Sequence, residues 1–196
     1  MNKKQGEILV REARKVVESA VKEEYYEIKL NEKWLTEKKG VFVTLEKYPS
    51  KMLRGCVGFS EPIFPLKKGL VKASEASAMQ DTRFLPVRKD ELEKITVEVS
   101  VLNEPKQISF KTPEEAISKI KIGEDGLIVE LNFSKGLLLP QVPEEFGWDV
   151  KDFLEQTCIK AGLPFTAWRD PRAKVYTFQS SIFRESKPNG EILQIS

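Results

Sequence analysis

Residues 95–102 have the clearest strand pattern in the chain and set the first constraint on its fold. The apolar positions are Ile95, Val97, Val99 and Val101, and the polar positions between them are Thr96, Glu98 and Ser100. Because the side chains of a β-strand point alternately to its two faces, this pattern predicts a strand with one apolar and one polar face. Such a strand belongs to a sheet, so the chain must fold around at least one sheet.

Helical and strand patterns interleave along the rest of the chain. Strands are expected over residues 41–45, 53–58, 127–131, 136–139 and 175–183, and helices over residues 9–20, 66–77 and 149–161, with a short helix that starts at Pro113 after Thr112 as its N-cap. Several neighbouring strands are separated only by short turns, as at Tyr48-Pro49-Ser50. We therefore expect an α+β fold with a mostly antiparallel sheet flanked by helices.

The length and composition are typical of a folded protein with a substantial core. The chain has 196 residues, 40% of them hydrophobic, and a formal net charge of +2. Its apolar runs are far shorter than the ~20 residues that a membrane-spanning helix needs. We expect a single domain over residues 1–196, with no membrane partner and, because the charges nearly balance, no nucleic-acid partner. Lys and Glu supply most of the charge, a composition that fits a heat-adapted source.

The chain contains no histidine, and this absence excludes several kinds of site. Ser-His-Asp and Cys-His catalytic groups and His-ligated zinc all need an imidazole. The sequence also lacks glycine-rich nucleotide motifs and acidic loops with EF-hand spacing, so neither a cofactor nor a metal is predicted. Two cysteines, Cys56 and Cys158, and a charged start without an apolar leader indicate reduced thiols in the cytoplasm.

The segment Leu53–Gly58 is the most unusual local feature. In a strand, Arg54 and Cys56 share a face, where the guanidinium favours the thiolate and lowers the pKa of the thiol. Gly55 and Gly58 leave room for a ligand or for another backbone segment. We interpret the segment either as an activated, exposed Cys56 in a glycine-lined trough, or as a small buried thiol beside an arginine that pairs with a carboxylate.

Asp81 and Arg83 form a second candidate site, in a loop that follows a helix rich in small residues. They are interpreted either as groups that line the same site as Cys56 and bind an anion or a polar ligand, or as a capping Asp with an ordinary ion pair. The aromatic stretch 140–148 is interpreted either as a pocket wall or partner surface, or as a loop packed against the body of the protein.

These motifs resemble those of the AMMECR-one family. Leu53–Gly58 is similar to the family signature Leu-Arg-Gly-Cys-Ile-Gly, and the resemblance continues in order through residues 81–86, 91–92, 97–102, 139–140, 147–149 and 160–162. The resemblance implies a two-lobed α+β fold with a cleft near the Arg54–Cys56 segment. It implies no defined reaction, but it does imply an association with Memo-like proteins and radical S-adenosylmethionine enzymes in a modification pathway.

Two positions depart from the family pattern. Where the family often has Gly-x-His-Gly, this chain has Asp125 in the histidine's place, and where the family often has Leu-Pro-Glu, this chain has Gln141 in the glutamate's place. If that His or that Glu were an obligatory acid or base, this chain would be inactive or would use Asp125 instead. The simpler inference is that neither the His nor the Glu is essential.

Two functional hypotheses follow from these residues. In the first, Cys56 is a nucleophile or covalent carrier, Arg54 activates it, and Asp81 and Arg83 position the substrate. In the second, the site holds a peptide, a protein partner or a small ligand, and Cys56 is structural. The Arg-x-Cys spacing favours the first hypothesis, and the scarcity of catalytic residue types favours the second. The sequence indicates no oligomeric state for either one.

Overall fold

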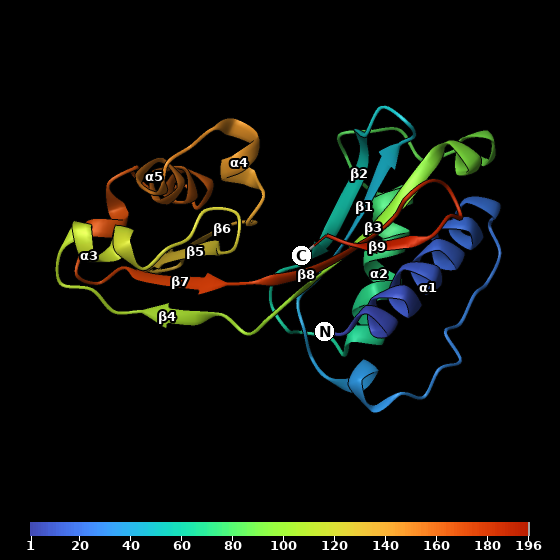
Figure 1. Ribbon diagram of the computed structural model, residues 1–196, viewed down its shortest axis with the longest axis horizontal. Helices are drawn as coiled ribbons and strands as arrows, with labels where there is room; N and C mark the ends of the chain where they lie inside the picture. The colour runs from blue at the N-terminus through green and yellow to red at the C-terminus, as the bar shows by residue number, and fades with distance from the viewer. Residues whose placement is uncertain (196) are drawn as a thin grey trace. The chain divides into compact units, whose positions relative to one another are not determined.

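The computed structural model describes residues 1–195, and the chain divides into two compact units (Figure 1). The first unit contains Met1–Leu102 and the C-terminal segment from Ser181 on, and the second unit contains Asn103–Ser180. Each unit has its own sheet with helices packed on it. The strand pairs whose register is defined are antiparallel in both sheets, which confirms the predicted α+β class.

The first unit is built on a five-stranded sheet with the strand order β2-β1-β3-β8-β9. Its strands are β1 (Val41–Lys47), β2 (Met52–Phe59), β3 (Ile95–Leu102), β8 (Ser180–Glu185) and β9 (Ile192–Gln194). Its helices are α1 (Lys3–Lys22) and α2 (Leu66–Met79), with short 3-10 helices over Lys33–Thr36 and Lys89–Lys94. Helix α2 contacts β1 and β2, and helix α1 contacts β3 and α2.

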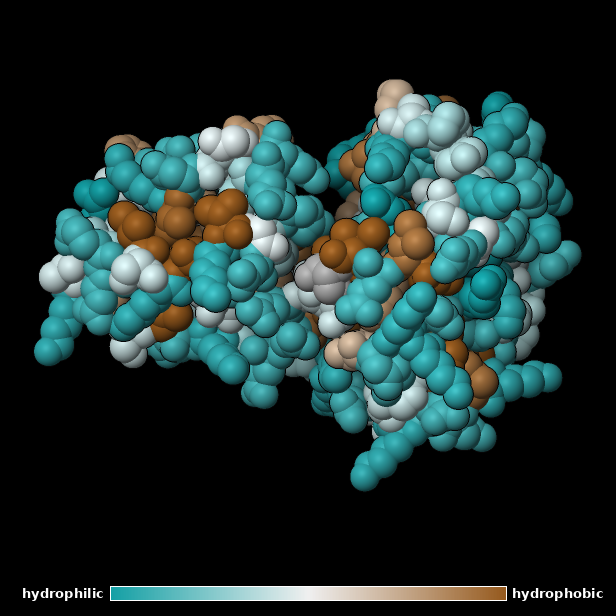
Figure 2. Space-filling model, viewed as in Figure 1, coloured by the Kyte–Doolittle hydropathy of each residue, from teal (hydrophilic) through white to brown (hydrophobic). Residues whose placement is uncertain are grey.

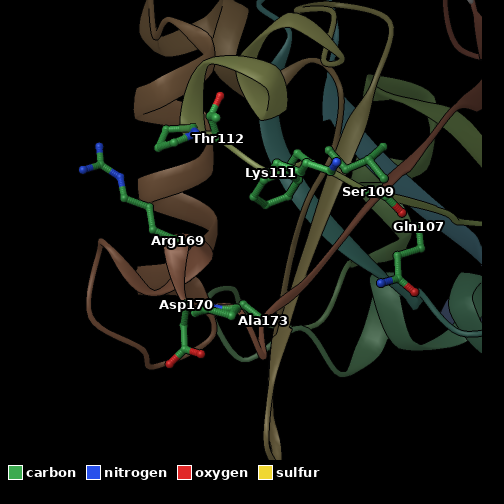
Figure 3. A pocket seen from close by; sticks show the side chains of 11 residues that line it. Gln107, Ser109, Lys111, Thr112, Arg169, Asp170 and Ala173 are labelled. Atoms are coloured by element: carbon green, nitrogen blue, oxygen red, sulfur yellow. The ribbon is translucent and has the colours of Figure 1, made fainter.

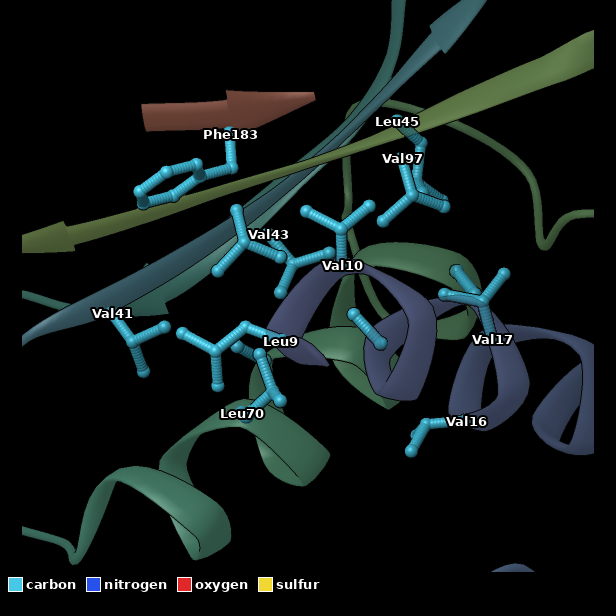
Figure 4. Close-up of a cluster of buried hydrophobic side chains, with 14 of the residues drawn as sticks. Leu9, Val10, Val16, Val17, Val41, Val43, Leu45, Leu70, Val97 and Phe183 are labelled. Carbon is cyan, nitrogen blue, oxygen red and sulfur yellow. The ribbon is translucent and has the colours of Figure 1, made fainter. Parts of the chain in front are cut away.

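The core of the first unit lies between this sheet and its two helices. Apolar residues of α1 recur at helical spacing, and Leu9, Val10 and Val17 are fully buried. They share one cluster with Val43 and Leu45 of β1 (Figure 4). Because alternate residues of β1 point into this cluster, the residues between them point to the opposite face of the sheet.

The second unit is built on a four-stranded sheet with the order β4-β7-β5-β6. Its strands are β4 (Lys106–Ile108), β5 (Gly126–Leu131), β6 (Ser134–Leu138) and β7 (Lys174–Phe178). Its helices are α3 (Pro113–Ser118), α4 (Val142–Phe146) and α5 (Val150–Lys160), with a 3-10 turn over Ala167–Arg169. Helix α5 packs on β5 and β6 and buries Phe153, Leu154 and Cys158. The predicted cap at Thr112 and the predicted β5–β6 hairpin are both confirmed.

The prediction of one strand over residues 175–183 is wrong. The segment forms two strands, β7 and β8, that are interrupted at Gln179 and belong to different sheets. The carbonyl group of Gln179 accepts a hydrogen bond from the backbone N–H of Asn103. The backbone carbonyl at the break between the two strands therefore has a hydrogen-bond partner. The segment contains no Gly or Pro, which are the residues that mark most strand ends, so the pattern alone gave no sign of the break.

Hydrophilic side chains cover most of the face seen in Figure 2, and hydrophobic groups gather there in a few patches. Such patches are common on folded proteins, because polar atoms are too few to cover the whole surface. Among residues 1–195, no helix is both long enough and apolar enough to cross a membrane.

A buried ion pair joins the two ends of the first unit's chain. The guanidinium of Arg14 in α1 binds the carboxylate of Glu185 in β8, and both side chains are at most 5% exposed. Arg14 also donates to the carbonyl oxygens of Leu92 (3.1 Å) and Ile95 (2.7 Å). Glu185 accepts the backbone N–H of Val97 at 3.0 Å. Both charges therefore have the partners that burial requires.

Replacement of Arg14 by Met should lower the free energy of unfolding by about 3–5 kcal/mol, because the carboxylate of Glu185 then stays buried without its partner. Denaturant unfolding followed by circular dichroism measures this change. Lys15→Met is the matched control, since Lys15 is half exposed in its pair with Glu12, and its loss should change stability by less than about 1 kcal/mol. Equal effects of the two substitutions would contradict the structural importance of the Arg14–Glu185 pair.

Candidate functional site

The candidate cysteine lies in a polar row that crosses three strands of the first unit. Cys56 of β2 is the register partner of Thr44 in β1, and Thr44 is the register partner of Glu98 in β3. Since the neighbours of Thr44 point into the core, this row lies on the face of the sheet opposite to α1 and α2. On the same face, Nη1 of Arg184 in β8 lies 3.3 Å from the carboxylate of Glu46 and 3.5 Å from that of Glu98.

The thiol of Cys56 is partly buried and accepts a hydrogen bond from the hydroxyl of Thr44, with 3.3 Å between Oγ1 and Sγ. Burial is the largest influence on its pKa and raises it. The Thr44 hydroxyl and the positive charge of Arg83 lower the pKa, while the negative charges of Glu98 and Asp81 raise it further. The net direction is upward, so the thiol is protonated at neutral pH.

Arg54 directs its guanidinium to a carboxylate and not to the thiol. Its Nε and Nη2 atoms donate to the carboxylate of Glu91 at 2.7 and 2.9 Å, and Nη2 also lies 3.3 Å from the carbonyl oxygen of Pro86. The Arg54 guanidinium lowers the pKa of Glu91 to about 2. In β2, Gly55 pairs with Leu45 and Leu53 pairs with Glu46, so a bulge at Arg54 interrupts the regular alternation of side chains.

The two glycines of the segment lie against protein backbone. A Cβ atom on Gly55 would lie 2.2 Å from the carbonyl oxygen of Ser77 in α2. A Cβ atom on Gly58 would lie 2.4 Å from the carbonyl oxygen of Val41 and 2.5 Å from the ring of Phe42. The glycines were expected to leave room either for a ligand or for another segment of the chain. At both positions a neighbouring segment of the chain fills the space beside the Cα atom.

Asp81 and Arg83 bind the backbone N–H and C=O groups of Cys56 at the free edge of β2. Oδ2 of Asp81 accepts the backbone N–H of Cys56 at 2.8 Å, and Nη2 of Arg83 donates to the carbonyl oxygen of Cys56 at 3.0 Å. The two side chains also bind each other, at 3.0 Å and 2.8 Å. The guanidinium of Arg83 holds the pKa of Asp81 well below its usual range. We call this pair the Asp81–Arg83 clamp, because it binds both backbone polar groups of Cys56 as a further strand would.

Beside the clamp, a cationic and an apolar group face solvent. The side chain of Arg83 is 54% exposed, and its guanidinium also interacts with the thiol of Cys56. Leu85, two residues later, is 84% exposed. The guanidinium groups of Arg83 and Arg54 both lie near the ring of Phe84, at 5.6 and 5.9 Å from its centroid. These groups form an outward surface next to Cys56.

The structure thus brings all six predicted site residues together in the first unit, and it adds residues that the sequence analysis did not select. Thr44, Glu98 and Glu91 contribute to the site through strand register and loop position, and each looks like an ordinary strand or helix residue in the sequence. Asp125 lies in the second unit, where its carboxylate accepts the backbone N–H of Lys121 and closes a turn. Gln141 also belongs to the second unit.

Comparison with known proteins gives a match to the family model AMMECR1 over residues 10–183. A protein of Thermococcus gammatolerans is 53% identical, and the match covers 95% of this chain and 93% of that protein. Protein MJ0810 of Methanocaldococcus jannaschii is 46% identical, with 97% and 94% covered.

The structural comparison agrees with the family match. The crystal structure of uncharacterized protein PH0010 from Pyrococcus horikoshii matches with a TM-score of 0.90 and 48% sequence identity, over 99% of this chain and 98% of that one. The fold described here is therefore similar to an experimentally determined fold along nearly its whole length.

Replacement of Asp81 by Asn tests the clamp through its pH dependence. A carboxyl group whose pKa is lowered by folding stabilises the protein above its unfolded pKa of about 3.9 and loses this effect as the pH falls through the folded value. Asp81→Asn should therefore lower the free energy of unfolding by about 1 kcal/mol at pH 7, a modest value because Arg83 is half exposed. This difference should shrink as the pH falls below about 4.

Thermal unfolding of both proteins from pH 7 to pH 2 measures the difference. Asp90→Asn is the matched control, because Asp90 pairs with Arg88 and Lys94 at an exposed position where ion pairs contribute little. A difference between the Asp81→Asn variant and the parent protein that stays constant down to pH 2 would refute the role of the Asp81 charge.

Proposed function

The chain belongs to the AMMECR1 family, and we propose that it is a binding protein whose ligand contacts the surface beside the Asp81–Arg83 clamp. One observation carries the proposal: the charged groups that thiol chemistry would need already serve the fold. Arg54 binds Glu91, and Asp81 binds Arg83 and the backbone of Cys56. The thiol itself has a raised pKa, so at neutral pH it lacks the charge of a nucleophile.

The exposed groups beside the clamp indicate the chemistry of the ligand. The half-exposed guanidinium of Arg83 can donate N–H groups to an oxygen acceptor, and Leu85 offers an apolar contact at 84% exposure. A peptide segment that carries a carboxylate or carbonyl oxygen next to an apolar side chain fits both groups. Because the clamp fixes Arg83 on two sides, little side-chain entropy is lost when a ligand binds there.

Thiol chemistry at Cys56 is the second candidate, and one contact favours it. The Thr44 hydroxyl donates to Sγ, a bond that would stabilise a thiolate once it forms. In this mechanism Cys56 is the nucleophile or covalent carrier, and Arg83 supplies the nearby positive charge. The pathway link to Memo-like and radical S-adenosylmethionine proteins, and the cleft near this segment, stay expectations from the resemblance.

The pH dependence of iodoacetamide alkylation, read by mass spectrometry, separates the two candidates. As a binding protein with a protonated thiol, the chain should show half-maximal reactivity of Cys56 above the free-thiol value of about 8.5. Cys158, which is fully buried, serves as the internal control and should react only after unfolding. Half-maximal reactivity of Cys56 below pH 8.5 would instead favour thiol chemistry.

Complementation tests the binding surface itself, in a host whose own copy of this gene has been deleted. The Cys56→Ala variant should restore the wild-type phenotype to the deletion host, because the thiol does not take part in binding. The Leu85→Ser variant should restore little of it. Ile63→Ser is the matched control, since Ile63 is an exposed apolar residue of the same unit at 55% exposure. Loss of rescue in a folded Cys56→Ala variant, or full rescue by Leu85→Ser, would contradict the proposal.

A further inference from the structure

A pocket of the second unit lies between the ends of β4 and β7, and its cationic side chains do not converge (Figure 3). Lys111 and Arg169 both line it, but their charged ends point apart. A site that selects a ligand needs polar groups that point to one place. In the first unit the free edge of β2 meets this condition, because backbone groups and the Asp81–Arg83 clamp follow one another along it.

Gly58 presents its backbone polar groups to the free edge of β2. The N–H and C=O of Cys56 point to this edge, where Asp81 and Arg83 bind them. Backbone groups alternate in direction along a strand, and the register is regular from Cys56 to Gly58, so the N–H and C=O of Gly58 point to the same edge. Outside the β1–β2 ladder, no residue that the structure describes binds either group.

The register on the other side of β1 gives the same result. The carbonyl oxygen of Gly40 accepts the N–H of Leu102, so the backbone of Gly40 faces β3. Phe42, two residues later, faces β3 as well and therefore leaves its register partner Gly58 in β2 without a backbone bond. Gly58 is also partly exposed. Unpaired edge groups of this kind bind an extended backbone segment.

The clamp limits how far such a segment can extend. Alternate residues of a strand lie ~6.8 Å apart, and the clamp fills the pairing position at Cys56, the next one after Gly58. A segment that pairs with Gly58 therefore has room for one more residue in the direction of Cys56. An antiparallel segment ends there with its carboxyl group, and a parallel segment with its amino group. One oxygen of a terminal carboxylate takes the place of the next peptide nitrogen, which brings it toward Arg83 at the Cys56 carbonyl.

The charges of the clamp favour the carboxyl end. The carboxylate of Asp81 accepts four hydrogen bonds, one from the backbone N–H of Cys56 and three from Arg83, so its lone pairs are occupied. The guanidinium of Arg83 is half exposed. An amino terminus would meet this cation without a free acceptor, whereas a carboxylate would gain a charge-assisted hydrogen bond.

We propose that β2 binds the carboxyl-terminal end of a partner polypeptide as an antiparallel strand, with the penultimate residue paired to Gly58 and the terminal carboxylate bound by Arg83. This inference rests on the proposed function and narrows its ligand to a chain end. An apolar last residue carries its side chain next to the carboxylate, which is the combination that Arg83 and Leu85 favour.

Four forms of one peptide test this binding mode, by titration of the 15N-labelled full chain followed by amide chemical shifts. The parent peptide is acetyl-Ala-Val-Ala-Leu with a free carboxylate, and it should shift the amides of residues 56–59 and 81–85 in a saturable manner. A C-terminal amide should weaken binding about tenfold, because the charge is lost. N-methylation of the penultimate residue should weaken it about fivefold, because that N–H donates to Gly58. N-methylation of the last residue, whose N–H points away from β2, is the matched control and should leave binding unchanged.

Replacement of Arg83 by Gln assigns the carboxylate contact. The Arg83→Gln variant should bind the free acid about tenfold more weakly and should no longer distinguish it from the amide. Arg88→Gln removes an arginine that is 76% exposed in its pair with Asp90, and it should keep the full preference for the free acid. The amide spectra of the free variants report whether each one is folded.

Equal binding of the free acid and the amide by the parent protein would overturn the inference, as would a preference that survives in a folded Arg83→Gln variant. The absence of saturable shifts at about 10 mM peptide would overturn it as well. Complementation by Leu85→Ser does not depend on a chain end. The proposed binding surface can therefore hold where recognition of a carboxyl terminus fails, and the two failures are distinguishable.

Discussion

The candidate site depends on the close approach of helix α2 to strand β2 at Gly55. The carbonyl oxygen of Ser77 occupies the space where a side chain of residue 55 would lie. From this position the Ser77 hydroxyl accepts the backbone N–H of Val57 and donates to the carbonyl oxygen of Val43. The helix ends at Met79, so Asp81 follows within reach of the Cys56 peptide group. A larger residue at position 55 would move the helix end away and separate the clamp from the strand.

The clamp also explains how the free edge of the sheet is protected. β2 is an edge strand, and unpaired edge groups invite pairing with another chain. At Cys56 the backbone N–H and C=O are both bound by a charged pair. Two residues earlier the strand has a bulge at Arg54, whose side chain binds Glu91. The Arg-Gly-Cys segment is therefore held on its edge by Asp81 and Arg83 and on its helix side by Ser77. This rigid support favours recognition over a reaction that would need the segment to move.

The sequence predicted local elements well, because their signals lie within a few residues. The strand Ile95–Leu102 has the predicted bounds, and Thr112 caps α3 because its side chain can reach the N–H of Glu115. The partner of Arg54 could not be predicted in the same way, since Glu91 is 37 residues away and only the folded loop brings it close. For the same reason the row formed by Cys56, Thr44 and Glu98 depends on strand register, which alternation alone does not define.

Four arginines of this chain differ in what they can offer a ligand. Arg14 and Arg54 lie buried in bidentate contact with a carboxylate, so a ligand that approached them would have to replace a strong charge-assisted bond. Arg169 stacks on the ring of Trp168, and its Nη2 atom lies 4.0 Å from the carboxylate of Glu155. Arg83 combines both properties, because Nε and Nη2 serve the clamp while its side chain stays 54% exposed. Recognition is thus expected at Arg83, while the arginine of the signature segment, Arg54, stabilises the fold.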